Sequence, residues 1–343
     1  MNGHEPRYAK HALVAEMLET QAVCSEIPVE RIRKLPSPGD TPFLVGEGSS
    51  RIFPAKRAIH AALLRGDRTV PRTESAHGAR ELDLNGRSVY VASNSGKTAE
   101  CVHLIHTLRE KQHEGRIIGL AGGASSPVAQ QSDEAYILTC GTEHAVAATK
   151  SVVEQALVYD LHFRMQEGHP LPDLKRLGED MTAAMKAHIP VELIEAVAAA
   201  PTIYFAGRDD GVAEELALKA NEIVRARSDF LPGTYAVHGI EEVMEPGDVL
   251  IWIDPPVDYE QKFDEVLQKG VGLKVFAVAS RETSFPTVRI PEPADRATAA
   301  YVQLAMGWNI LVEAGVSLGI NLDKPNRARK VGNEFVADES GDE

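Results

Sequence analysis

The chain has 343 residues, of which 43% are hydrophobic and 25% charged, which is the composition of an ordinary globular protein long enough for two domains. Its formal net charge of −14 argues against nucleic acid as a partner, because such binding depends on basic contacts to phosphates. We expect no membrane span and no signal peptide, and three scattered cysteines favour the reducing environment of the cytoplasm.

The predicted elements alternate between strands and helices along the first half of the chain. Residues 1–35 are predicted to be helical, because apolar residues such as Leu13 and Met17 recur at roughly helical spacing. Short apolar strands are then predicted at Phe43–Val45, Val89–Ala92, Ile117–Leu120 and Ala135–Leu138. The clearest helical patterns that follow them are Ile52–Leu64 and Ala145–Phe163. This alternation predicts a parallel β-sheet with helices on both faces.

The second half of the chain repeats this plan. Its predicted strands are Thr202–Ala206, Val249–Ile253, Leu273–Val278 and Thr287–Ile290, and its clearest helices are Val212–Arg225 and Ala294–Ala314. The strands lie roughly 150–160 residues after their counterparts, and self-similarity at a fixed period indicates a duplicated unit. The sequence therefore predicts a helical segment at 1–35, one α/β domain at 36–168, a second at 169–335 and a disordered acidic tail at 336–343.

The stretch from Val89 to Glu100 predicts a phosphate site. A β-branched strand runs into Ser-Asn-Ser-Gly-Lys-Thr, and a helical pattern follows directly. In such a loop the backbone N–H groups, the positive end of the helix dipole and the hydroxyl groups all favour an anion. The predicted anchors are Ser93, Asn94, Ser95 and Thr98, together with Ser49 and Ser50 from the loop after the adjacent strand. The plainer alternative is a helix start that is capped by hydroxyl groups.

The corresponding loop of the second copy has a different chemistry. It reads Asp-Pro-Pro-Val-Asp-Tyr-Glu over Asp254–Glu260, so that two prolines remove backbone donors and three carboxylates repel phosphate. We therefore expect the duplication to keep the fold in both halves and the anion site in the first half only.

At this point the chain resembles the tandem sugar isomerase (SIS) domain family, in particular the isomerase half of glucosamine-6-phosphate synthase. Five motifs match in order along most of the chain, at Ser93–Glu100, Gly141–Ser151, Leu216–Ile223, His238–Gly239 and Asp323–Val331. The resemblance implies two tandem SIS domains, each a three-layer αβα unit around a parallel sheet, with an N-terminal helix. The glutamine-hydrolysing domain of the synthase has no counterpart in this sequence.

The resemblance also implies the catalytic residues. Glu222 falls on the family's base for proton transfer between C1 and C2, and Lys219 lies beside it. His238 falls on the ring-opening histidine, which in the family comes from the neighbouring subunit, so a homodimer with shared active sites is implied. Lys330 falls on the C-terminal lysine that approaches the open-chain carbonyl. Spacing alone allows plainer interpretations, namely a surface Lys–Glu pair, a loop histidine and a basic tail residue.

Three departures from the family pattern bear on the substrate. The segment before His238 lacks the family's acid and proline, because it reads Tyr-Ala-Val-His-Gly-Ile. Ala148 replaces a family serine in the segment that also contains Val146, and both residues are expected to line the substrate pocket. Lys97 replaces the usual acid of the phosphate loop. These changes leave the predicted anchor intact and leave the identity of the sugar open.

The resemblance implies an enzyme that acts on a hexose or amino-hexose 6-phosphate by C1–C2 proton transfer, as an isomerase or a deaminase. A deglycase acting on a fructosamine-type 6-phosphate is an alternative enzyme, and a non-catalytic sugar-phosphate-binding regulator is the alternative from another class. We expect no cofactor and no metal site, since the histidines and cysteines lack metal-ligand spacing. The expected partners are the sugar phosphate and a second copy of the chain.

Overall fold

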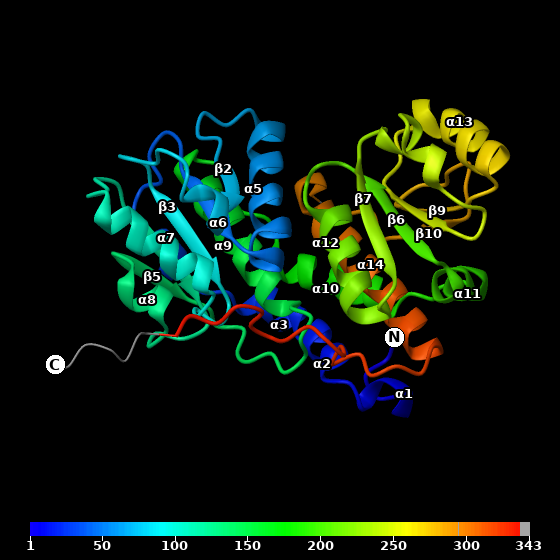
Figure 1. Ribbon diagram of the computed structural model, residues 1–343, viewed down its shortest axis with the longest axis horizontal. Coiled ribbons are helices and arrows are strands. Elements are labelled where there is room, and N and C mark those ends of the chain that lie inside the picture. The colour runs from blue at the N-terminus through cyan, green and yellow to red at the C-terminus, as the bar shows by residue number, and fades with distance from the viewer. Residues whose placement is uncertain (294, 337–343) are drawn as a thin grey trace. The chain divides into compact units, whose positions relative to one another are not determined.

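The computed structural model describes residues 1–293 and 295–336 (Figure 1). These residues form two compact units. The first-sheet unit consists of Pro28–Thr142, Glu154–Leu171 and the residues from Arg329 onward, and the second-sheet unit consists of Met1–Ile27, Glu143–Val153 and Pro172–Ala328. Apart from residue 336, the predicted disordered tail at 336–343 lies outside the described residues.

Each unit is built on one parallel sheet, as the sequence predicts, but each sheet has five strands where the sequence predicts four. The first sheet has the order β2-β1-β3-β4-β5 and contains β1 (Phe43–Gly46), β2 (Arg72–Ser75), β3 (Val89–Ser93), β4 (Ile117–Ala121) and β5 (Glu134–Ile137). The second has the order β10-β9-β8-β6-β7 and contains β6 (Thr202–Gly207), β7 (Arg227–Pro232), β8 (Val249–Ile253), β9 (Lys274–Ala279) and β10 (Thr287–Arg289). The two sheets therefore share one topology, in which the first strand of each lies between its second and third strands.

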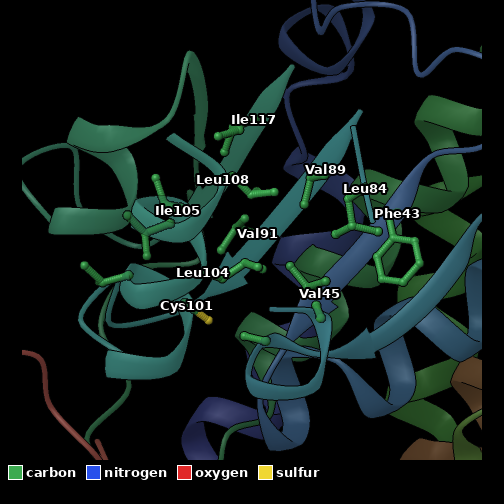
Figure 2. Close-up of a cluster of buried hydrophobic side chains, with 14 residues drawn as sticks. Phe43, Val45, Leu84, Val89, Val91, Cys101, Leu104, Ile105, Leu108 and Ile117 are labelled. Carbon is green, nitrogen blue, oxygen red and sulfur yellow. The ribbon is translucent and has the colours of Figure 1, made fainter. Parts of the chain in front are cut away.

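Helices cover both faces of the first sheet. Successive side chains of β3 point to opposite faces, and the apolar side chains on each face pack against a helix. Val89 and Val91 point toward α7 (Ala99–Glu110), where they pack with Leu104 and neighbouring apolar residues (Figure 2). Tyr90 points the other way, and its ring lies edge-on to that of Tyr159 of α9 (Lys150–Gln166), 5.9 Å between centroids. The remaining helices of this unit are α4 (Val29–Arg33), α5 (Ile52–Arg65), α6 (Ala76–Ala79) and α8 (Pro127–Gln131).

The second sheet has the same layered construction. Trp252 of β8 stacks on Phe263 of α13 (Glu260–Phe263) with ring centroids 3.6 Å apart. Two further helices, α12 (Val212–Lys219) and α14 (Ala299–Ser317), lie in close contact, because a Cβ atom at Gly307 would come within 2.3 Å of Leu216. The other long helices of this unit are α10 (Leu174–Lys186) and α11 (Val191–Ala199).

The N-terminal segment consists of four short helices where the sequence predicts one helical run. They are α1 (Pro6–Ala9), α2 (Ala12–Leu18), α3 (Thr20–Glu26) and α4. The start of α2 is fixed by a distant residue, because the Asp323 carboxylate accepts hydrogen bonds from the N–H groups of Ala12 and Leu13, at 3.1 and 2.8 Å. Pro28, which has no N–H, marks the break before α4. Local helical spacing is present, but these breaks depend on tertiary contacts and on a proline.

Two predicted helices begin later than their apolar patterns. The helix predicted from residue 145 begins at Lys150. The backbone before it follows an irregular path, because its N–H groups donate to the carboxylates of Glu16 and Glu143. The helix predicted at Ala294–Ala314 begins at Ala299 and continues to Ser317, and Ala294 itself lies outside the described residues. None of the described helices is long and apolar enough to cross a membrane.

Candidate functional site

The phosphate loop predicted from the sequence connects the end of β3 to the start of α7. Its turn depends on Gly96, which has a φ of +64° and whose Cβ, if present, would lie 2.1 Å from the hydroxyl oxygen of Ser126. Its backbone is held by hydrogen bonds from Gly122 N–H to Asn94 O (2.8 Å) and from Val128 N–H to Gly96 O (3.0 Å). The loop therefore has a conformation that a side chain at position 96 would disrupt.

The hydroxyl groups of this loop gather at one point. Ser93 Oγ lies 2.8 Å from Thr98 Oγ1 and 3.4 Å from Ser95 Oγ. Thr98 occupies the N-cap position of α7, but its side chain accepts no N–H of that helix, so the hydroxyl does not serve as a cap. Among the described residues, the N–H groups of Ser95 and Thr98 also lack an acceptor. The loop thus presents hydroxyl and amide donors together, as an anion site requires.

The loop after β1 ends at the same edge of the sheet. Strands β1 and β3 pair in parallel, with Gly46 opposite Ala92, so their carboxyl ends are adjacent. A Cβ atom at Gly46 would lie 3.0 Å from the Ala92 carbonyl and 3.1 Å from that of Ser50, which shows how closely the backbone around Ser49 and Ser50 approaches β3. In this strand order the boundary between the first and third strands is the switch point at which open α/β sheets bind ligands.

The C-terminal segment runs along the start of α7. Ala99 N–H donates to Asn333 O (3.0 Å), Phe335 N–H donates to Lys97 O (2.8 Å), and Lys97 Nζ lies 3.0 Å from a carboxylate oxygen of Glu334. Lys330 is exposed and lies three residues before Asn333, a separation of at most about 10 Å along the chain. The first-sheet unit therefore brings Lys330 into the neighbourhood of the hydroxyl loop. The sequence did not predict this contact, which involves exposed polar residues far apart in the chain.

The predicted pocket segment belongs to the second-sheet unit, where buried carboxylates fix its path. Glu143 accepts hydrogen bonds from Thr149 N–H (2.8 Å) and from the Ser151 hydroxyl (2.7 Å). Val146 N–H donates to Asp323 O at 2.9 Å. Val146 and Ala148 are half-buried, whereas the residues that alternate with them are buried. The two predicted pocket residues thus share the more accessible side of the segment.

The predicted base lies next to a buried lysine. Lys219 ends α12 and is fully buried, and its ammonium group lies 2.6 Å from Glu222 and 3.2 Å from Glu215. Burial alone would lower the pKa of Lys219, but the two carboxylates outweigh burial and raise it above its ordinary value. Glu222 retains 20% exposure of its side chain and lies in a π-helical stretch, Ala220–Val224, that follows α12. Glu215, four residues before Lys219, was not predicted, although helical spacing would have indicated it.

His238 is exposed, and its Nε2 atom lies 3.2 Å from the Thr234 hydroxyl. It follows the carboxyl end of β7, whereas Glu222 precedes the amino end of the same strand. At about 3.3 Å per residue, the six residues of β7 separate the two ends by about 17 Å. Lys219 and Glu222 are therefore brought together within one chain, and Glu222 and His238 are not.

Metal binding has no geometric support among the described residues, which contain no cluster of three or more histidine, cysteine, aspartate or glutamate side chains that could hold an ion. His103 and His106, three residues apart on α7, instead place their rings 5.7 Å from that of Phe335. Their role is packing of the C-terminal segment.

Comparison with known proteins identifies the fold. The family model described as SIS domain matches residues 85–165. The glutamine–fructose-6-phosphate aminotransferase (isomerizing) of Sulfolobus acidocaldarius is 25% identical over 252 residues, which cover 71% of this chain and 42% of that protein. The chain thus spans less than half the length of that relative. It contains a SIS domain and is homologous to the SIS part of the aminotransferase.

Solved structures share the whole architecture. Glucosamine-6-phosphate deaminase from Thermotoga maritima has a TM-score of 0.74 at 20% sequence identity, covering 93% of this chain and 99% of that one. Tagatose-6-phosphate ketose/aldose isomerase from Escherichia coli has a TM-score of 0.70 at 14% identity, covering 96% and 94%. These likenesses confirm the predicted fold of two parallel sheets, each flanked by helices.

Proposed function

We propose that the chain is a SIS-type enzyme that transfers a proton between C1 and C2 of a hexose or amino-hexose 6-phosphate, as an isomerase or a deaminase. The observation that carries the proposal is the hydroxyl loop at the switch point of the first sheet, whose donors suit a phosphate group. The relatives add weight, since their names describe an aminotransferase that isomerises, a deaminase and an isomerase of sugar phosphates.

The proposed roles are divided between the two units. In the first-sheet unit the hydroxyl groups of Ser93, Ser95 and Thr98, with Asn94, hold the phosphate, and Ser49 and Ser50 assist from the adjacent loop. In the second-sheet unit Glu222 acts as the base, and the buried ammonium group of Lys219 keeps its carboxylate oriented. Lys330 approaches the open-chain carbonyl, and Val146 and Ala148 contact the sugar.

The buried Lys219 can hold the proposed base, Glu222, in one orientation. A carboxylate that shuttles a proton between neighbouring carbons has to hold one orientation, and a hydrogen bond from a fully buried ammonium group supplies that restraint. The accessible part of Glu222 leaves an oxygen for the substrate. A non-catalytic regulator would bind the phosphate without needing a base at this position.

The base can be tested directly by replacing Glu222 with glutamine, which keeps the shape and removes the proton acceptor. We expect turnover of hexose 6-phosphates and glucosamine 6-phosphate to fall at least a hundredfold, while the thermal shift produced by the same ligands remains. Glu195→Gln, an exposed substitution in α11, is the matched control and should keep full rate. Full turnover by the Glu222 variant would refute the assigned base, and a wild type that binds but never turns over would favour the regulator.

The phosphate anchor can be tested separately at Thr98. Thr98→Val keeps the branched shape and removes the hydroxyl, whereas Thr98→Ser keeps the hydroxyl. We expect the thermal shift with sugar phosphates to shrink in the valine variant and to persist in the serine variant. Equal thermal shifts in both variants would show that this hydroxyl does not contribute to phosphate binding.

The separation of Glu222 from His238 favours a site completed by a second copy of the chain. We propose a homodimer in which the partner's His238 opens the sugar ring at the site that contains Glu222. Glu222→Gln and His238→Ala should each be inactive alone. After subunit exchange, hybrid dimers carry one intact site, so a mixture should recover up to about a quarter of wild-type turnover. No recovery in a mixture that is shown to contain hybrids would contradict shared sites.

A further inference from the structure

The second sheet has its own switch point, at the boundary between β6 and β8. Its order, with the first strand between the second and third, is the order of the first sheet, and ligands of such sheets bind outside the carboxyl ends at this boundary. In the first sheet the corresponding place holds the hydroxyl loop. In the second sheet it holds Arg208, directly after β6, and Asp254, directly after β8.

A pocket of about 490 Å³ opens at this point. Its volume lies in the range of small-molecule sites, about 300–1,000 Å³. Strand ends contribute Arg208, Asp254, Ser280 and Arg281 to its wall, and Gln303 contributes from the first turns of α14. All of these residues belong to the second-sheet unit. The pocket is therefore formed by one unit alone.

The guanidinium groups of this pocket are held by carboxylates. Arg208 Nη1 lies 2.6 Å from Asp254 Oδ2, and Arg281 Nη2 lies 2.6 Å from Glu260 Oε1. Asp254 has a φ of +47°, a backbone conformation that is uncommon for residues other than glycine and that recurs at ligand sites. A further arginine, Arg296, lines the pocket and forms no ion pair within the described part of the chain.

Gln303 gives an independent sign of a ligand. Its side chain lines the pocket, the residue is only 4% exposed, and its amide has no hydrogen-bond partner among the residues described by the structure. Because the rest of this side chain is buried, its small accessible part faces the pocket, and its hydrogen bonds have to come from water or a ligand there. A polar ligand in the pocket would supply both the acceptor and the donor that this side chain needs.

We propose that this pocket is a second ligand site, which binds the oxyanion group, phosphate or carboxylate, of a small hydroxylated molecule. Arg296 and the outer edge of Arg208 bind the oxyanion, because planar guanidinium groups match oxyanions in paired hydrogen bonds. Gln303 and Asp254 bind hydroxyl groups. Since prolines follow Asp254, this site depends on side chains where the first-sheet loop uses backbone donors as well.

Hydrogen exchange of the full-length protein tests the site and locates it. With inorganic phosphate at millimolar concentration, we expect protection of peptides covering 254–257 and 280–303. The double variant Arg296→Ser and Gln303→Leu should lose this protection, with phosphate binding about tenfold weaker or more. Arg227→Ser, which removes an exposed arginine of β7 outside the pocket, is the matched control and should behave as wild type. Succinate in place of phosphate shows which oxyanion is preferred.

Two results would overturn the proposal. One is the absence of saturable protection in these peptides with both anions. The other is equal protection in the wild type and in the double variant, provided that the variant has the wild-type melting temperature. Protection of peptides around residues 93–98 reports the loop of the first sheet, so failure of the proposed function and failure of this inference are distinguishable in one experiment.

Discussion

Replacing Lys219 by methionine tests the electrostatic construction of the second-sheet unit. The ammonium group of Lys219 is fully buried and faces Glu215, which is also fully buried, and Glu222, which is partly exposed. Methionine has a similar length and no charge, so the substitution keeps most of the packing and removes the cation from between two carboxylates.

The expected loss of unfolding free energy follows from the difference in burial between the two carboxylates, Glu215 and Glu222. Breaking a buried ion pair by removing one partner costs about 3–5 kcal/mol, because a charge is left inside the protein. Glu222→Gln leaves Lys219 paired with Glu215 and loses only one charge-assisted hydrogen bond, worth roughly 1–2 kcal/mol. We therefore expect Lys219→Met to destabilise the unit more than Glu222→Gln, by about 2 kcal/mol or more.

The assay is urea unfolding followed by tryptophan fluorescence. Both tryptophans, Trp252 and Trp308, lie in the second-sheet unit and are buried, so the signal reports this unit. Lys262→Met, an exposed substitution in α13, is the control and should change the free energy of unfolding by less than about 0.5 kcal/mol.

The raised pKa of Lys219 adds a pH condition to this prediction. Burial lowers the pKa of this group, but Glu222 and Glu215 raise it by more, so the folded state favours the ammonium form. The stabilisation is then complete below the pKa of an unfolded lysine, about 10.4, and is lost only as the pH rises through the raised value. Titration of Lys219 itself should therefore add no slope to the difference between wild type and Lys219→Met from about pH 6 to pH 9. A difference below about 1 kcal/mol at pH 7 would refute the reasoning.

Three further predictions concern the first-sheet unit. Burial lowers the pKa of His162 to about 4, so stability should fall by up to about 3 kcal/mol as the pH drops from about 6.5 to 4, and His162→Gln should flatten this slope in urea midpoints measured by circular dichroism. Gly96→Ala should lower the melting temperature more than Gly86→Ala, because both positions have positive φ but only a Cβ at position 96 meets another residue; equal losses would contradict the close contact. Phe335→Ala should raise hydrogen exchange at the start of α7 and lower turnover, whereas Val336→Ala, which is 79% exposed, should do neither.

The central strands could be predicted from sequence because they are buried on both faces. Val249–Ile253 is the predicted strand β8 to the residue, and all five of its positions are buried. The strands that were missed, β2 and β7, are the edge strands of their sheets and are partly exposed and polar. Their sequences contain little apolar periodicity, so pairing with β1 and β6 decides their conformation. The same strand was missed in both repeats for the same physical reason.

The candidate site shows a similar division. The hydroxyl loop and the Lys219–Glu222 pair were predictable, because each is a local pattern within one turn or one strand–loop–helix unit. Two contacts could not be predicted from the sequence, namely that of Asn333 with Ala99 and that of the Asp323 carboxylate with the start of α2. These contacts join residues more than two hundred positions apart, and no local spacing encodes them.

The duplicated topology explains how two different chemistries arise from one fold. Each sheet has a single switch point, and the strand order fixes its location independently of the residues that follow the strands. In the first sheet, Gly96 allows the backbone to present its N–H groups beside hydroxyl groups. In the second sheet, Pro255 and Pro256 have no N–H groups to present, and arginine side chains line the corresponding place. The two proposed sites would thus occupy equivalent places in a duplicated fold, and their ligands can diverge because the donors lie outside the strands that stabilise the sheet.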